Sequence, residues 1–370
     1  MELQDICSYV KTKVETSNYS IEDYISTENM LPEKGGITVA SSFPSGKVTE
    51  FQENDILISN IRPYFKKIWK ADRRGCCSND VLCIRANNNV DAEFLYYLLS
   101  QDLFFAYVMS GANGSKMPRG DKQQIMNWEI ELPSEKEDQH RIASILSSLD
   151  RKIELNNKIN ADLEEMAQAI FKNWFVDFEP FKDGKFVDSE LGMIPEGWKV
   201  GTLGELCNFK RGKNLLTKNA IDEGVPVVAG GLEPSCYHNV ANTGAPVITV
   251  SGSGANAGFM RMYHVPVWAS DCSFIDISCE NFYFVYCFLK VNSKLLKHAQ
   301  TGAVQPHVKP SDIHDFELVI PDKESIYEFQ DKVKPFFDKI AAIQKENSRL
   351  SLLRDTLLPR LMSGELEVPE

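Results

Sequence analysis

A glycine-rich segment at residues 251–258 is the part of the chain most similar to a cofactor-binding loop. Its sequence is Ser-Gly-Ser-Gly-Ala-Asn-Ala-Gly. A dinucleotide-binding loop has the pattern Gly-x-Gly-x-x-Gly between a strand and a helix, so that backbone N–H groups at the helix N-terminus bind the pyrophosphate. Here the third glycine comes one residue late, and no strand-loop-helix unit of that type surrounds it. We therefore predict a turn, including Ser253 and Asn256, in which glycine lets the backbone approach a phosphate or a neighbouring strand closely.

Residues that could form a catalytic or metal centre are not clustered in this sequence. The six histidines show neither the His-Glu-x-x-His pattern nor another compact ligand spacing, and the nine cysteines include no Cys-x-x-Cys pair. There is no Gly-x-Ser-x-Gly nucleophile elbow, no Walker loop and no Asn-Pro-Pro-aromatic tetrapeptide of the adenine methyltransferases. We expect reduced, mostly buried thiols, no metal site and no catalytic residue in this chain.

Basic side chains are interleaved with aromatic ones between residues 60 and 75. Six lysine and arginine residues occur there beside a single acidic residue, Asp72. Basic side chains neutralise phosphates, and arginine can also donate two hydrogen bonds to a guanine in the major groove. The alternative is a solvated hairpin whose aromatic rings turn to the core. In this segment we predict DNA contacts from Asn60, Arg62, Tyr64, Lys66, Lys67, Lys70, Arg73 and Arg74.

Smaller basic groups occur elsewhere in the chain. One lies in a loop of the first half that precedes residue 120, and others lie near the start and near the end of the second half. They indicate phosphate contacts but do not say which bases are read. With the glycine-rich turn, they add the following residues to the predicted DNA-binding set: Lys116, Arg119, Lys210, Arg211, Lys213, Ser253, Asn256, His307 and Lys309.

The net charge opposes a free-standing DNA-binding protein. With 52 acidic and 40 basic residues the chain carries −12, whereas phosphate neutralisation favours basic proteins. Local basic faces, or partners that supply positive charge, would reconcile the acidic net charge with DNA binding. The 370 residues are enough for two domains. No apolar run reaches the roughly 20 residues that span a bilayer, and residues 1–5 lack the features of a signal peptide, so we expect a cytoplasmic protein.

An internal repeat with a period of about 190 residues organises the chain. Leu3-x-x-Ile6-Cys7 recurs as Leu203-x-x-Leu206-Cys207. Both halves contain short apolar strands separated by Gly, Pro, Asn and Ser, with one or two helices, which predicts two β-rich α+β modules at residues 1–133 and 185–320. Further matching segments, in the same order, are residues 55–59 and 247–251, 78–80 and 269–271, 94–99 and 282–289, and 110–112 and 301–303.

A long helix follows each module. The first helix and a linker make up residues 134–184, and the second helix makes up residues 321–370. Apolar residues recur there at spacings of three and four, which is typical of a coiled-coil seam. The simplest arrangement is an antiparallel coiled coil that relates the two modules by a pseudo-two-fold axis, with an asparagine in each seam fixing the register. The alternative is that each helix packs on its own module. The predicted seam residues are Ile142, Leu149, Ile153, Asn156, Ile159, Leu163, Val333, Ile340, Asn347, Leu350 and Leu353.

Several longer motifs stand out, and they are Gly120-Asp121-Lys122, residues 139–146, residues 170–178, residues 192–198 and residues 357–365. Together they resemble motifs of the specificity subunit of Type I restriction-modification systems. The resemblance covers essentially the whole chain. One departure is that no counterpart of Pro195-Glu196-Gly197-Trp198 precedes Leu3, so the first strand of the first module is expected to be shortened or its start misassigned.

The resemblance implies a function without catalysis by this chain. Such a subunit carries two target-recognition domains, each reading one half of an asymmetric bipartite DNA site. Its long helices separate these domains and bind two methylation subunits, which use S-adenosylmethionine. Restriction subunits of the full complex use ATP and Mg, so we expect no cofactor on this chain. The alternatives are a self-sufficient DNA methyltransferase or nuclease, and a non-catalytic scaffold whose modules bind proteins.

Overall fold

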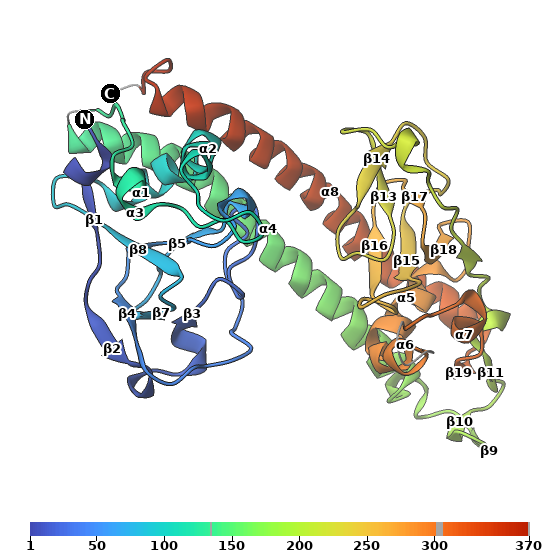
Figure 1. The fold of residues 1–370 in the computed structure, drawn as a ribbon. Helices are drawn as coiled ribbons and strands as arrows, with labels where there is room; N and C mark the ends of the chain where they lie inside the picture. Colours follow the sequence, from blue (N-terminus) through green and yellow to red (C-terminus); the bar gives the residue numbers. More distant parts are fainter. Residues whose placement is uncertain (134, 301–305, 369–370) are drawn as a thin grey trace. The chain divides into compact units, whose positions relative to one another are not determined.

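The chain divides into two compact units. A computed structural model describes residues 1–133, 135–300 and 306–368 (Figure 1). One unit is Met1–Leu155 with Glu346–Glu370, and the other is Asn156–Lys345. The two longest helices, α4 (Lys136–Phe175) and α8 (Lys323–Met362), each contribute one part to each unit. The repeat segment predicted at residues 301–303 lies outside the described residues.

The first unit contains two four-stranded sheets and three short helices. One sheet is antiparallel, with the order β1-β8-β5-β6, and the other has the order β2-β4-β7-β3, in which β3 and β7 are parallel. The strands are β1 (Cys7–Tyr9), β2 (Lys13–Glu15), β3 (Tyr24–Ile25), β4 (Lys47–Phe51), β5 (Ile56–Ser59), β6 (Ile68–Lys70), β7 (Gly75–Cys77) and β8 (Val81–Ala86). The helices are α1 (Ala92–Leu99), α2 (Asp102–Ser110) and α3 (Lys122–Met126).

Strand β5 is buried along its whole length because both faces of its sheet are covered. Ile56 and Ile58 pack in one core with Phe94 of α1. Leu57 packs in another core with Phe51 of the second sheet. Successive side chains of a strand point to opposite faces, so a strand between two apolar layers is apolar at every position.

In the first unit, the beginning of α4 packs antiparallel to the end of α8. Ile142 shares a core with Leu361. Further along α4, Asp150 accepts a hydrogen bond of 2.7 Å from Nη1 of Arg354, which lies earlier in α8. The same carboxylate accepts a 2.6 Å hydrogen bond from the hydroxyl of Tyr97 in α1. Asp150 therefore ties both α1 and α8 to the long helix.

The second unit repeats this plan with additional hairpins. Its sheets have the orders β12-β18-β15-β16, β14-β13-β17, β11-β19 and β10-β9. The strands are β9 (Phe186–Ser189), β10 (Gly192–Pro195), β11 (Lys199–Thr202), β12 (Lys210–Arg211), β13 (Val225–Val228), β14 (Cys236–His238), β15 (Val247–Ser251), β16 (Met260–Tyr263), β17 (Trp268–Ala269), β18 (Cys272–Asp276) and β19 (Glu317–Ile320). The helices are α5 (Phe282–Val291), α6 (Ser293–His298) and α7 (Pro310–His314).

The core of the second unit is built on aromatic side chains from both long helices. Phe329 near the start of α8 is fully buried, and its ring lies 5.7 Å from that of Phe171 and 5.2 Å from that of Phe175, both near the end of α4. Phe284 of α5 completes the cluster, with its ring 5.0 Å from Phe175. The end of α4 thus packs against the beginning of α8 in this unit as well.

The repeat expected from the sequence is visible in equivalent contacts. The Sγ atoms of Cys7 and Cys207 each lie 3.4 Å from a backbone oxygen four residues earlier, that of Leu3 or Leu203. The sheets β1-β8-β5-β6 and β12-β18-β15-β16 have corresponding strand orders. The β11-β19 ladder of the second unit has a single-bridge counterpart in the first, between residues 2 and 129.

Each module is also joined to a long helix by a glutamine. Gln139 of α4 accepts a 3.0 Å hydrogen bond from the backbone N–H of Asp91, the residue that caps α1. Gln330 of α8 accepts a 3.0 Å hydrogen bond from the N–H of Tyr283 in α5. The predicted α+β class with two long helices is confirmed, and within each unit these helices run antiparallel.

The predicted seam residues differ in their burial. In the first unit Leu353 is 46% exposed, and the α8 side chain that meets α4 at this turn is Arg354. An arginine can bury its aliphatic part while its paired charge stays accessible, so a search for apolar residues alone misses it. The buried seam residues are Ile142, Asn156, Val333 and Ile340, and the half-buried ones are Leu149, Ile153, Ile159, Leu163, Asn347 and Leu350. Among the described residues, no helix is both long and apolar enough to cross a membrane.

Candidate nucleic-acid interface

The first module brings two of the predicted DNA-binding segments together. The backbone N–H of Arg62 donates to the oxygen of Pro118 at 2.8 Å, and the N–H of Gly120 donates to the oxygen of Asn60 at 3.3 Å. A glycine at residue 120 allows this approach, because a Cβ atom would lie 2.9 Å from Asn60 Oδ1 and 2.8 Å from Val108 Cγ1 and would force these side chains to shift. We call the meeting of residues 60–62 with residues 118–120 the first loop junction.

Two polar atoms at the first loop junction have no hydrogen-bond partner in the described part of the chain. They are Oδ1 of Asn60, a side chain only 9% exposed, and Nε of Arg62. A buried polar atom without a partner is costly, and a ligand that supplies the missing bond recovers that cost. Both atoms are covered in this structure, so a ligand could bond to them only after the neighbouring side chains move.

Arg119 is held at the same junction by its backbone and by its side chain. Its N–H and C=O form two hydrogen bonds of 2.9 Å with Asn113. Its Nη2 lies 3.3 Å from Oδ1 of Asp80, yet the Arg119 side chain remains 58% exposed. A guanidinium that has an ion-pair partner on one side and is exposed on the other can still donate hydrogen bonds to a ligand.

Most of the basic segment that follows is neutralised within the molecule. Lys66 lies 3.0 Å from Asp102 and 3.6 Å from Glu33. Burial disfavours the Lys66 ammonium, but its two acidic partners outweigh that effect and raise its pKa. Lys70 pairs with Glu93 of α1, and Arg74 pairs with Glu50 of β4. The sequence could not reveal these pairs, because every acid except Asp72 lies outside the segment.

The remaining side chains of this segment have mixed surroundings. Lys67 donates to the backbone oxygen of Thr27 at 2.7 Å, and burial lowers its pKa. Arg73 lies over the ring of Trp69, 5.5 Å from its centroid, and bonds to Asp72 at 2.8 Å. Tyr64 is exposed. Trp69 packs against a core, as the hairpin alternative expects, whereas Tyr64 faces solvent, so the DNA contacts of this segment stay a prediction.

The second module forms an equivalent meeting of loops. The N–H of Gly254 donates to the oxygen of Pro306, and the N–H of Val308 donates to the oxygen of Gly252, both at 3.1 Å. Ser253 and His307 form the bridge between them. We call this the second loop junction. It corresponds to the bridge between residues 61 and 119 in the first module. The sequence alone did not indicate that these segments meet.

Arg211 of β12 joins the second loop junction through Asp271. The Asp271 carboxylate accepts hydrogen bonds from the Arg211 guanidinium and from the hydroxyl of Ser253. Gly252 allows the approach, because a Cβ atom there would lie 2.2 Å from Nη1 of Arg211. Gly254 has a φ of +80°, as expected for a glycine-dependent turn, and Asn256 bonds to the oxygen of residue 230.

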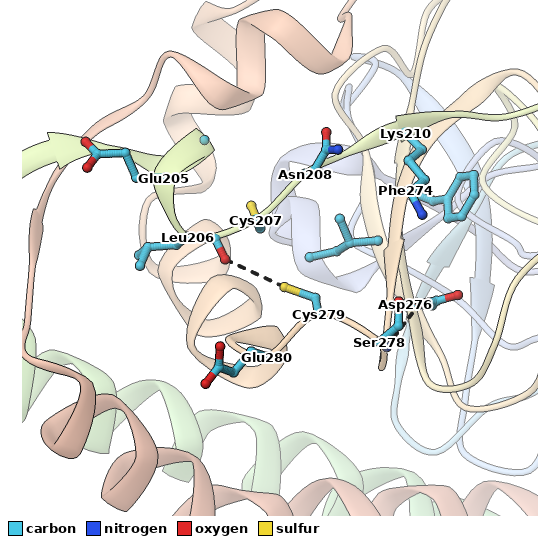
Figure 2. Close-up of a pocket in the computed structure, with 12 residues that line it drawn as sticks. Glu205, Leu206, Cys207, Asn208, Lys210, Phe274, Asp276, Ser278, Cys279 and Glu280 are labelled. Atoms are coloured by element: carbon cyan, nitrogen blue, oxygen red, sulfur yellow. Dashed lines mark hydrogen bonds between the residues drawn. The ribbon is translucent and has the colours of Figure 1, made fainter.

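Lys210 belongs to a different surface, the pocket of about 450 Å³ in Figure 2. Three carboxylates, those of Glu205, Asp276 and Glu280, line this pocket beside that single ammonium. The Asp276 carboxylate is itself bonded to the hydroxyl of Ser278. A lining with excess negative charge repels phosphate, so the pocket is a poor site for DNA.

Three predicted lysines are exposed and form no ion pair among the described residues. They are Lys116 near the first loop junction, Lys213 after β12, and Lys309 beside the second loop junction. Lys116 lies two residues before Pro118 of the first junction, and Lys309 follows Val308 of the second junction. In the described ranges, no group of three or more His, Cys, Asp and Glu side chains is arranged to hold a metal ion.

Comparison with known proteins identifies the family. A model described as the type I restriction modification DNA specificity domain matches residues 1–165 and 195–351, one match for each half of the repeat. This chain belongs to that family. Its match to both halves agrees with the two loop junctions and with the repeated sheets.

Individual relatives of this DNA specificity family cover much of the chain. The type I restriction enzyme MjaIX specificity subunit of Methanocaldococcus jannaschii is 33% identical over 76% of this chain and 71% of its own length. The HindI specificity subunit of Haemophilus influenzae is 26% identical over 98% of both chains. The crystal structure of the S subunit of a Type-I restriction-modification system from M. genitalium has the same fold, with a TM-score of 0.57 and 19% identity over 98% of this chain and 95% of that one.

Proposed function

We propose that this chain is the DNA-recognition subunit of a Type I restriction-modification complex and reads a bipartite, asymmetric DNA site. The observation that carries the proposal is the occurrence of two similar but non-identical loop junctions, one in each half of a repeat that belongs to a DNA specificity family. Residues 1–133 and 185–320 are the two target-recognition domains. Residues 134–184, a helix and linker, and residues 321–370, the second long helix, are the spacer between the half-sites.

Catalysis belongs to partner subunits in this proposal. The relatives are named as specificity subunits of type I restriction enzymes. Two methylation subunits bring S-adenosylmethionine and transfer its methyl group to adenine, and restriction subunits use ATP and Mg. This chain itself binds no cofactor. Its charge of −12 fits this division, since positively charged partners can complete the contact with DNA.

A methyl-transfer assay separates this proposal from a self-sufficient enzyme. The purified chain is incubated with duplex DNA and labelled S-adenosylmethionine, first alone and then with the methylation subunits encoded beside it. We expect no transfer by either component alone and transfer to adenine when both are present. Transfer by this chain alone would show that it is an enzyme. A complex that retards neither DNA nor any other nucleic acid in a gel would instead favour a protein-binding scaffold.

The ion pairs distinguish phosphate contacts from structural lysines. We expect Lys116→Ala to reduce the slope of log binding constant against log salt by about 0.9, the value for one phosphate contact in duplex DNA. Lys66→Ala is the matched control and should leave the slope unchanged, because Glu33 and Asp102 already neutralise Lys66. The measurement is a salt titration of DNA binding by the complex. An unchanged slope for Lys116→Ala would remove that residue from the interface.

A further inference from the structure

Two aspartates outside the predicted DNA-binding set occupy equivalent positions in the repeat. Asp80 lies immediately before β8, and Asp271 lies immediately before β18. These two strands hold the same place in the corresponding sheets of the two modules. Each aspartate forms an ion pair with an arginine of the predicted set, Asp80 with Arg119 and Asp271 with Arg211. An aspartate that pairs with an arginine therefore occurs at the same position in both modules.

Each aspartate is also fixed to its loop junction by the backbone. The oxygen of Asp80 accepts a 2.9 Å hydrogen bond from the N–H of Asn60, the first residue after β5. The oxygen of Asp271 accepts a 3.1 Å hydrogen bond from the N–H of Gly252, the first residue after β15. Both carboxylates therefore sit on rigid strand ends at the edge of the surface where the loops meet.

The two arginines approach their aspartates from different elements. Arg119 comes from the loop before α3, whereas Arg211 comes from β12. At the bridge position of the second module, His307 replaces Arg119. The carboxylate position is conserved between the two halves of this chain, but the direction of the guanidinium is not. Two modules that share a frame and differ in this direction would present different donors to DNA.

We propose that Asp80 and Asp271 are positioning residues, each holding one arginine in the orientation in which it reads a base of its own half-site. This inference rests on the proposed function. The guanidinium is a planar fork that can donate two parallel hydrogen bonds to O6 and N7 of guanine, and it does so only when its plane is correctly oriented. A carboxylate at one edge of the fork fixes that plane and leaves the other edge for the base.

Two alternatives explain the pairs less well. A purely stabilising role is weak, because more than half of the Arg119 side chain is exposed and ion pairs at such sites contribute little. A phosphate contact is disfavoured, because the aspartate carboxylate would repel the phosphate that its arginine was meant to bind. A base edge in the groove carries no net charge, so the aspartate does not repel it. An arginine that reads a base also has a reason to stay exposed.

The expected effect is a loss of sequence discrimination confined to one half-site. Asp80→Asn keeps the size of the side chain but removes the charge, so the Arg119 guanidinium is no longer held. One correctly placed two-bond contact discriminates between bases by about 5- to 150-fold. We expect Asp80→Asn to lose discrimination of this order at one base pair of one half-site, and Asp271→Asn to do so in the other half-site only.

The experiment sequences methylated adenines in DNA treated with the complex of the full chain and its methylation subunits. The arms are the wild-type chain, Asp80→Asn, Asp271→Asn, and the conservative Asp80→Glu, which keeps the charge and should retain most discrimination. Glu365→Gln and Glu179→Gln are matched controls, because they remove the charge from other exposed ion pairs, with Arg360 and Lys182. Unfolding temperatures measured on every variant identify any loss of folding.

The outcomes separate this inference from the proposed function. A wild-type complex that methylates no two-part sequence rejects the proposed function, and the inference with it. A wild-type two-part sequence with relaxation of a different half-site by each aspartate variant supports the inference. If both folded variants keep every base preference, or only methylate more slowly at the same sequence, the aspartates are structural and the inference alone is rejected. If the control variants lose base preference to the same degree as the aspartate variants, the inference alone is likewise rejected.

Discussion

Inserting seven residues after Leu155 and seven after Lys345 is expected to widen the gap between the two half-sites by about three base pairs. Seven residues of helix add about 10.5 Å at 1.5 Å per residue, and duplex DNA rises about 3.4 Å per base pair. Both insertions fall at the boundary between the compact units, so the contacts within each unit are kept. Seven residues are also one heptad, so the apolar seam of the two helices keeps its register across the insertions.

The base sequences of the half-sites should not change, because the insertions leave both loop junctions intact. The measurement is the sequence context of methylated adenines produced by the complex. A seven-residue insertion in the turn after Glu190, between β9 and β10, is the matched control and should leave the gap unchanged. An unaltered gap after the paired insertions, or altered half-sites with the original gap, would contradict a spacer role for α4 and α8.

Replacing Phe329 by alanine is expected to destabilise the second unit by about 3 to 5 kcal/mol, the usual cost of removing a buried phenylalanine. Its ring is fully buried and faces Phe171, Phe175, Trp174 and Phe284, with ring separations from 5.2 to 6.4 Å. Both long helices and α5 lose contacts together when this ring is removed. A loss of this size is a large fraction of the stability of an ordinary domain.

The measurement is urea unfolding followed by tryptophan fluorescence, since Trp174 reports from the same cluster. Tyr327→Ala is the matched control, because Tyr327 lies on the same helix two residues earlier and is 71% exposed. A surface change of that kind should alter the free energy of unfolding by less than about 0.5 kcal/mol. Equal effects of the two substitutions would mean that α8 does not pack through this cluster.

The sequence predicted the elements better than their detailed contacts. The repeat and the two long helices could be read from spacing, because a helix face or a strand segment imposes a period on the chain. The prediction of the coiled-coil seam was less accurate near the end of α8. Leu353 fits an apolar heptad but is exposed, while Arg354 packs there because Asp150 on α4 pairs with its charge. A partner so distant in sequence leaves no local signal.

In the candidate interface, too, the sequence predicted local features but not the contacts between distant segments. The glycine-dependent turn at residues 252–254 was predicted from composition, since glycine has few other reasons to cluster beside a strand. The neutralisation of Lys66 by Asp102, and the pairs that Asp80 and Asp271 form with arginine, depend on contacts between remote segments. Sequence reasoning counted the basic residues in one segment and could not count the acids that the fold brings to them.

The most direct test maps methylated adenines in the genome of cells that carry this gene with its methylation subunits, and in cells that lack it. The account predicts methylation, only in the first strain, at one asymmetric sequence made of two short specified parts with a fixed number of unspecified base pairs between them. A single uninterrupted recognition sequence, two parts at variable distance, or identical patterns in both strains would contradict it.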